Sequence, residues 1–166
     1  MRSFIVEDGT GLSTATSLCS VADADDHWAT HPQVATLWDP LHSEEKEARL
    51  MHASLLASRR LRWRGNPLSR TQAFPIPATE LYDYQGRLQS SSAVPADVKR
   101  GIAELAGLIG RAGVVAGDSP AIKSQSTGPV SVTYAATAGG RTIEGIPAQV
   151  IQYLDPYIFA EPMLAR

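Results

Sequence analysis

The sequence has a single cysteine and no long uninterrupted apolar run, and only 19% of its 166 residues are charged. Because Cys19 stands alone, an internal disulfide is excluded. The longest apolar-rich stretch, residues 102–115, contains Glu104 and Arg111 and is shorter than the roughly 18 clean apolar residues of a membrane span. The first eight residues lack the apolar segment of a secretory signal. We therefore expect a soluble protein that is not secreted.

Motifs that carry common chemistry are also lacking. The sequence has no G-x-x-x-x-G-K-[ST] loop and no G-x-S-x-G elbow. Gly9-Thr10-Gly11 follows the β-prone Phe4-Ile5-Val6, but Thr14 replaces the third glycine of a dinucleotide fingerprint, so a turn explains it better. Cys19 has no neighbour that would lower its pKa. We expect no enzymatic activity and no cofactor.

Two histidines have a spacing used by metal sites. His27 and His31 are four residues apart, which places both imidazoles on one face of a helix. Trp28 stands where a zinc protease has its glutamate, and the sequence offers no obvious third ligand. Solvated or interface histidines are the better interpretation, and a metal-dependent enzyme is the weakest functional hypothesis.

Charge is strongly segregated along the chain. Residues 1–47 contain nine acids and two bases, a balance of −7, whereas residues 48–70 contain six arginines and no acid. The remaining residues, 71–166, are nearly neutral. The two blocks either neutralise each other within one fold or pair between neighbouring copies. The second arrangement is a head-to-tail contact, which closes into a ring when the rotation allows.

Helix signals occur in four places. Ser20 is a good N-cap, Asp23 completes an acidic capping box, and Pro32 ends this first helix. A second helix begins at Ser43 and stops at Gly65. Its apolar stripe consists of Leu50, Ala53, Ala57 and Leu61, widened by Met51 and Leu55.

The other two helices are framed by prolines and glycines. The third begins at Pro95 and ends near Gly113 or Gly117, with an apolar face of Val98, Ile102, Leu105, Ala106 and Ile109. Its glycines 101, 107 and 110 predict close packing against another backbone, because glycine otherwise weakens a helix. A short closing helix runs from Pro147 to Pro156.

The rest of the chain predicts less regular structure. Residues 1–19 form an extended arm, 66–93 a long loop, 118–145 strand material and 159–166 a tail. In the strand material, Val130, Val132 and Tyr134 share one face and Gly139-Gly140 is a candidate turn. We predict a mainly α single domain: a small bundle of about four helices, comprising a core at 20–117 and a C-terminal helix at 146–158, with the arm, the loop and a short β-hairpin.

The basic block ends in Arg59-Arg60-Leu61-Arg62-Trp63-Arg64, which supports two interpretations. Arginines along a phosphate track, with an aromatic ring to stack a base, are typical of single-stranded DNA binding. However, the sequence pI is near 6.1, which is not the global basic character of a tight binder. We favour Trp63 as a core residue at a helix end and the arginines as interface residues.

The order of motifs resembles a known family. The motifs are Val6-Glu7-Asp8-Gly9-Thr10-Gly11, Ser20 to Asp25, Lys46 to Gly65 ending in Trp63-Arg64-Gly65, Gln72-Ala73-Phe74-Pro75, Val94 to Lys99, Gly128 to Tyr134 and Val150 to Pro156. Together they resemble small phage proteins often labelled putative DnaT-like single-stranded-DNA-binding proteins. The likeness covers nearly the whole chain.

This resemblance implies a structural role in the virion. Such proteins look like head-tail connectors: adaptors that form a ring, with twelve copies expected, between the portal and the neck or tail proteins, with duplex DNA passing through the lumen. The protein would be assembled in the host cytoplasm. Candidate interface residues are Arg59, Arg60, Arg62, Trp63, Arg64 and Phe159.

We also expect neighbouring copies to satisfy the backbone groups of residues 1–19, 66–93 and 123–145. The tail that begins at Phe159 is the candidate portal contact. The alternative is a single-stranded-DNA-binding protein that uses residues 59–64.

Overall fold

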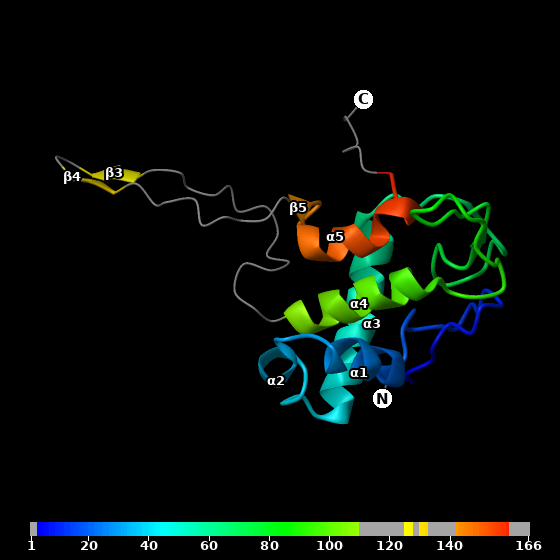
Figure 1. The fold of residues 1–166 in the computed structure, drawn as a ribbon, viewed down its shortest axis with the longest axis horizontal. Coiled ribbons are helices and arrows are strands. Elements are labelled where there is room, and N and C mark those ends of the chain that lie inside the picture. The colour runs from blue at the N-terminus through cyan, green and yellow to red at the C-terminus, as the bar shows by residue number, and fades with distance from the viewer. Residues whose placement is uncertain (1–2, 110–124, 128–129, 133–141, 160–166) are drawn as a thin grey trace.

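The computed structural model describes residues 3–109, 125–127, 130–132 and 142–159 (Figure 1). Its helices are α1 (Val21–Ala29), α2 (Val34–Leu37), α3 (Ser43–Arg60), α4 (Ala96–Leu108), α5 (Ala148–Leu154) and the 3-10 turn η1 (Asp155–Tyr157). Its strands form three antiparallel pairs: β1 (Asn66–Pro67) with β2 (Ala78–Thr79), β3 (Gln125–Thr127) with β4 (Val130–Val132), and β5 (Thr142–Ile143) with β6 (Ile146–Pro147). The predicted mainly helical fold is confirmed.

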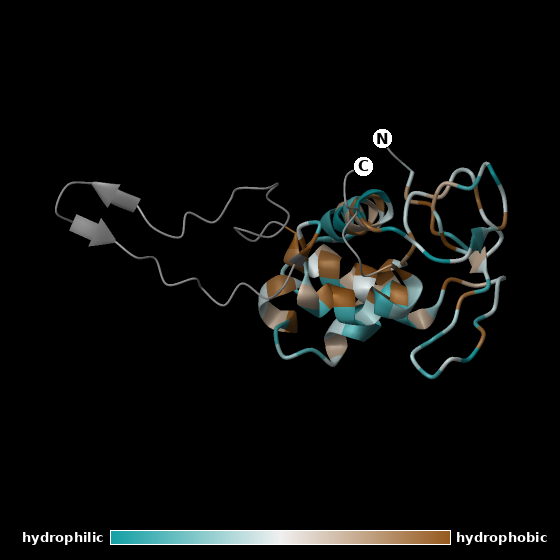
Figure 2. Cartoon of the chain, turned by 90° about the horizontal axis from the view of Figure 1, so that it is seen from above, coloured by the Kyte–Doolittle hydropathy of each residue, from teal (hydrophilic) through white to brown (hydrophobic). Residues whose placement is uncertain are grey.

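Helix α4 is the centre of the described core. It packs against α1, α3 and α5 (Figure 1). Figure 2 shows that these helices carry both apolar and hydrophilic residues, as expected of helices with one buried side. No helix in the described ranges combines the length and apolar character needed to cross a membrane.

Helix α1 begins as the sequence predicts. The Ser20 hydroxyl accepts a hydrogen bond from the Asp23 amide at 3.0 Å, and the Asp23 carboxylate accepts one from the Ser20 amide at 3.4 Å. This reciprocal capping box satisfies backbone donors at the start of the helix. The short helix α2 was not predicted, and it makes no capping bond with a side chain.

Three predicted helix ends are wrong, and the first is that of α1, which ends at Ala29 and not just before Pro32. Helix α3 ends at Arg60 instead of Gly65, because Leu61 takes an extended conformation and the following residues pair with the chain near Ile158. Helix α4 ends at Leu108 instead of Gly113 or Gly117. The Arg49 guanidinium donates a hydrogen bond to the Ile109 carbonyl at 2.7 Å, which satisfies an acceptor at this helix end.

The N-terminal segment folds back on its own chain. The amide of Glu7 donates to the Ser17 carbonyl at 2.8 Å, and the Leu18 amide donates to the Ser54 hydroxyl on α3 at 2.9 Å. Glu7 is 3% exposed, and its carboxylate accepts hydrogen bonds from three amides, those of Gly9, Gly11 and Leu12. The expectation that neighbouring copies satisfy this arm is therefore wrong for residues 3–19.

Residues 66–93 also form hydrogen bonds and a buried apolar cluster within their own chain. Strands β1 and β2 pair within the loop, and its apolar side chains Phe74, Ile76, Ala78 and Leu81 are buried. The Gln72 amide group donates to the carbonyls of Phe74 and Pro77. A Cβ on Gly9 would lie 2.1 Å from the Ser92 carbonyl oxygen, so the N-terminal segment lies directly against the end of this loop. Burial of these side chains anchors the loop to its own chain. The pairing of β1 with β2 also satisfies backbone groups within the chain that neighbouring copies were expected to satisfy.

The strand region is described only in part. Val130 and Val132 lie in β4 as predicted, whereas Tyr134 and Gly139-Gly140 fall outside the described residues. A hairpin that the sequence did not predict joins β5 to β6. Its turn residues Glu144 and Gly145 both have positive φ, at 51° and 79°, as a two-residue hairpin turn requires.

Candidate nucleic-acid interface

Two distant candidate segments meet in the structure. Residues 62–64 and 157–159 form an antiparallel contact in which Trp63 is paired with Ile158. The Arg64 amide donates to the Tyr157 carbonyl, and the Phe159 amide donates to the Arg62 carbonyl, both at 2.8 Å. The basic segment and the first residue of the predicted tail are therefore part of one surface.

Alternation along these extended segments decides which side chains face outward. Ile158 is fully buried and Trp63 is half-buried, whereas Arg62, Arg64 and Phe159 are exposed. The Arg62 and Arg64 guanidinium carbons lie 4.9 Å and 5.1 Å from the centre of the Phe159 ring. Such exposed cation–π contacts contribute about 0.5–1 kcal/mol each. We call Arg62, Arg64 and Phe159 the Arg–Phe surface.

Trp63 belongs to the end of α3. Its indole nitrogen donates to the Ala57 carbonyl at 3.1 Å, an acceptor that also receives the Leu61 amide, so the ring is tied to the last turn of the helix. The side chain also packs against the buried core. Phe159, which is 43% exposed, is therefore the aromatic ring available to a ligand.

The two arginines at the end of α3 differ in their surroundings. Arg59 is exposed. Arg60 is half-buried, donates to the Glu144 carbonyl at 3.1 Å and covers Gly145, where a Cβ would lie 2.6 Å from its guanidinium nitrogen. Arg60 thus holds the turn between β5 and β6, which leaves Arg59 as the exposed arginine of this pair.

The acidic and basic blocks form no ion pair with each other in the described part of the chain. Asp23 pairs with Lys99 at 3.1 Å and Asp25 with Lys46 at 2.8 Å, so neither acid contacts an arginine of residues 48–70. The arginines at 59, 60, 62 and 64 have no carboxylate within ion-pair distance among these residues. No carboxylate of the described residues therefore neutralises Arg62 or Arg64.

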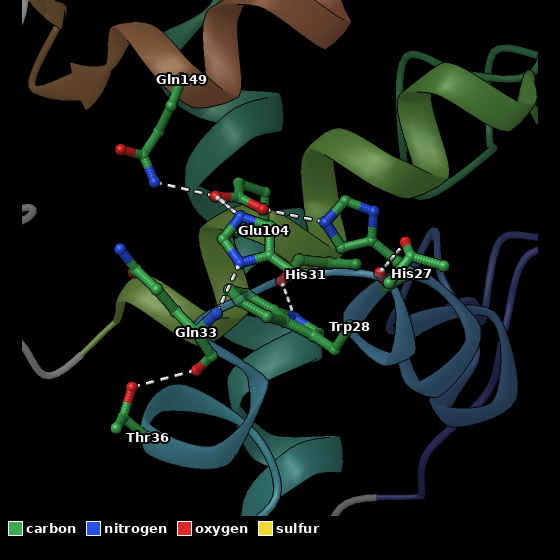
Figure 3. A network of polar contacts seen from close by, with 9 residues as sticks. His27, Trp28, His31, Gln33, Thr36, Glu104 and Gln149 are labelled. Carbon is green, nitrogen blue, oxygen red and sulfur yellow. Dashed lines mark hydrogen bonds and ion pairs between the residues drawn. The ribbon is translucent and has the colours of Figure 1, made fainter.

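The two helix-spaced histidines meet a buried carboxylate. His27 Nε2 lies 2.8 Å from one oxygen of Glu104, and His31 Nε2 lies 3.6 Å from the other (Figure 3). Gln149 on α5 donates to Glu104 at 2.8 Å. Burial disfavours ionisation of Glu104, but the hydrogen bonds from His27 and Gln149, together with the electrostatic effect of both histidines, lower the pKa of this carboxyl.

This arrangement does not favour a metal. The Gln33 amide donates to His31 Nδ1 at 3.2 Å, so the proton of the neutral ring is on Nε2, the atom nearest Glu104. To ligate a metal through this atom, His31 would have to move the proton and give up its contact with Glu104. The described ranges contain no group of three side chains able to hold one. The sequence did not reveal Glu104 as the partner of the histidines, because it lies on another helix. Its position as a single carboxylate in an apolar stretch was the one sign of its burial beside a partner.

The single cysteine is buried beside the N-terminal segment. Burial raises the pKa of the Cys19 thiol to about 12, so the reactive thiolate is scarce at neutral pH. The nearby Asp23 adds to this rise in pKa and Lys99 opposes it, but burial is the largest cause.

Comparison with known proteins identifies a family. A family model described as "Putative DnaT-like ssDNA binding protein" matches residues 2–163. The searches of curated proteins and of solved structures found no match. Because the matched region spans nearly the whole sequence, the chain belongs to the family of putative DnaT-like ssDNA-binding proteins.

Proposed function

We propose that the protein binds single-stranded DNA and that the Arg–Phe surface carries this binding. The observation that supports the proposal most directly is the placement of two arginines beside an exposed ring, with no carboxylate in ion-pair distance among the described residues. The description of the family points to the same ligand. The role is binding without turnover.

The chemistry of the surface suggests how a strand would bind. The guanidinium groups of Arg62 and Arg64 would contact phosphates, and the exposed part of the Phe159 ring would stack a base. Neither contact reads base edges, so little sequence preference is expected. Arg59, exposed on the last turn of α3, can add a further phosphate contact.

Fluorescence anisotropy with a labelled oligothymidylate of about 12 nucleotides tests the proposal. We expect binding that weakens steeply with salt, and we expect Arg62→Ala to lower the slope of log K against log salt by about 0.7. Phe159→Ala should weaken binding about 5- to 150-fold without changing that slope, because it removes a stacking contact. Arg100→Ala, an exposed arginine on α4, is the matched control.

The proposal fails if the wild-type protein shows no binding at low salt. It also fails if Arg62→Ala and Phe159→Ala bind as tightly as Arg100→Ala, because the Arg–Phe surface would then be irrelevant to DNA.

A second candidate function is the head-tail adaptor, and the charge distribution favours it. With no ion pair joining residues 1–47 to residues 48–70 in the described ranges, the acidic block of one copy could face the basic block of the next. Since residues 3–19 and 66–93 fold on their own chain, such a ring would be held by surfaces instead of exchanged arms. A portal and a neck protein would be its partners.

Native mass spectrometry separates the two functions. A ring of about twelve copies, formed alone or on addition of portal protein, supports the adaptor. A monomer in both conditions that binds oligothymidylate supports the DNA-binding function and contradicts the adaptor.

A further inference from the structure

The loop between β2 and α4 contains a small hairpin at residues 81–89. Tyr82 and Leu88 are paired across it, and the Gln89 amide donates to the Leu81 carbonyl at 2.8 Å. The Asp83 carboxylate fixes the tip by accepting hydrogen bonds from the amides of Gln85 and Arg87, both at 2.9 Å, and from the Arg87 guanidinium at 2.8 Å. The hairpin therefore presents its side chains in a defined arrangement.

This hairpin exposes large apolar groups. Tyr82 is 51% exposed and Leu88 is 64% exposed, and as direct cross-strand partners they lie on the same side of the hairpin. Tyr84 is also exposed, but its hydroxyl donates a hydrogen bond to the Gln152 carbonyl on α5. Tyr82 is thus a half-exposed ring on a hairpin whose backbone is paired at this position.

The hairpin lies next to the Arg–Phe surface. Gly65, which follows Arg64, is packed so closely that a Cβ there would lie 2.9 Å from the Leu81 side chain. On the other side, Tyr84 contacts α5, which leads through η1 to Phe159. Burial, together with the nearby Asp97, Asp83 and Tyr84, raises the pKa of Tyr157 to about 12. Leu81 at the base of the hairpin therefore lies against Gly65, which follows the basic segment, and Tyr84 near the tip bonds to α5, the helix that leads to Phe159.

We propose that single-stranded DNA bound at the Arg–Phe surface continues onto the hairpin, where the Tyr82 ring stacks a further base and Leu88 supports the contact. The proposal rests on the proposed DNA-binding function and extends its site. One ring beside one leucine is small for a protein interface, which needs roughly 800 Å² on each partner, whereas a single base needs only one ring face.

The electrostatics of the hairpin give the proposal a distinctive signature. Arg87 is bound to Asp83 within the tip, so the hairpin offers no uncompensated arginine to a phosphate. A stacking contact at Tyr82 would therefore add affinity without releasing counterions. The slope of affinity against salt should depend on Arg62 and Arg64, and not on Tyr82.

The test compares Tyr82→Ala and Tyr82→Phe by anisotropy with an oligothymidylate of about 12 nucleotides across a salt series. We expect Tyr82→Ala to weaken binding about 5- to 150-fold with an unchanged salt slope, and Tyr82→Phe to restore wild-type affinity, because the ring and not the hydroxyl stacks. Leu55→Ala, at an exposed apolar position on α3, is the matched control.

Photocrosslinking of the wild-type protein to an iodouracil oligonucleotide provides a readout that needs no variant. Crosslinks at Tyr82, together with crosslinks at Phe159, are the expected result. If the wild type binds DNA but Tyr82→Ala binds equally well and Tyr82 is not crosslinked, the extension is overturned while the proposed function stands. If the wild type binds no oligonucleotide, both are overturned.

Discussion

At the scale of single residues, two glycines of α4 mark places where side chains pack closely against the central helix. Gly101 lies against Leu154, and Gly107 lies against the fully buried ring of Trp28. The sequence predicts close packing here, but the partners are side chains and not a backbone. These two positions let α5 and α1 approach the central helix.

Gly107→Ala should therefore destabilise the protein although alanine is the better helix former. A Cβ at this position would lie 2.1 Å from the Trp28 ring, and the indole nitrogen of Trp28 is fixed by a hydrogen bond to the Ala103 carbonyl. We expect overpacking to cost about 1–3 kcal/mol, more than the gain of about 1 kcal/mol in helix propensity. Urea unfolding measures the difference.

Arg100→Ala is the control for this prediction, because it introduces alanine on an exposed position of the same helix. Its free energy of unfolding should stay within about 0.5 kcal/mol of the wild type. If Gly107→Ala were as stable as Arg100→Ala, Trp28 would have room to move and the close contact would not limit this core.

At the scale of elements, local signals predicted where helices begin, and long-range contacts decided where they end. Ser20 and Asp23 start α1 through bonds within one turn. Gly65, by contrast, is a local stop signal that α3 never reaches, since pairing of residues 62–64 with 157–159 turns the chain earlier. The sequence singled out the arginines and Phe159 as separate candidate interface residues. It could not predict that residues 62–64 pair with residues 157–159, because no local sequence pattern indicates a contact between such distant segments.

The junction of α1, α4 and α5 at Glu104 should make stability depend on pH. Because the fold lowers the pKa of Glu104 below its ordinary value of 4.5, the ionised carboxylate stabilises the protein above that pH. This contribution is lost as the pH falls through the lowered folded-state pKa. Glu104→Gln should cost about 1–3 kcal/mol at neutral pH, since it removes the charge from buried hydrogen bonds.

Unfolding in urea between neutral pH and about pH 3 measures this effect. The gap in free energy between the wild type and Glu104→Gln should narrow below pH 4.5, where the carboxyl begins to take up a proton. Other carboxyls with lowered pKa, such as Asp23 and Asp25, are common to both proteins and cancel in the difference. Parallel curves at all pH values would show that Glu104 has no such role.

At the scale of the whole molecule, the net negative charge of the protein opposes DNA binding at the proposed site. The formal charge is −2, and nine of the acids lie in residues 1–47. A DNA strand at the Arg–Phe surface would be attracted by nearby arginines and repelled by the more distant acidic block. Because such repulsion is screened over about 10 Å at 0.1 M salt, its effect depends on ionic strength.

Neutralising part of the acidic block should therefore raise DNA affinity only when salt is low. The triple variant Asp26→Asn, Asp39→Asn, Glu44→Gln changes three exposed carboxylates and moves the formal charge from −2 to +1. We expect affinity for an oligothymidylate to rise several-fold at about 50 mM salt and to equal that of the wild type at about 500 mM, where the Debye length falls to a few ångströms. A gain that persists at high salt would mean that these positions contact DNA directly. No gain at low salt would mean that the acidic block does not influence the bound strand. It would contradict the prediction that repulsion from residues 1–47 opposes attraction by the arginines of residues 48–70.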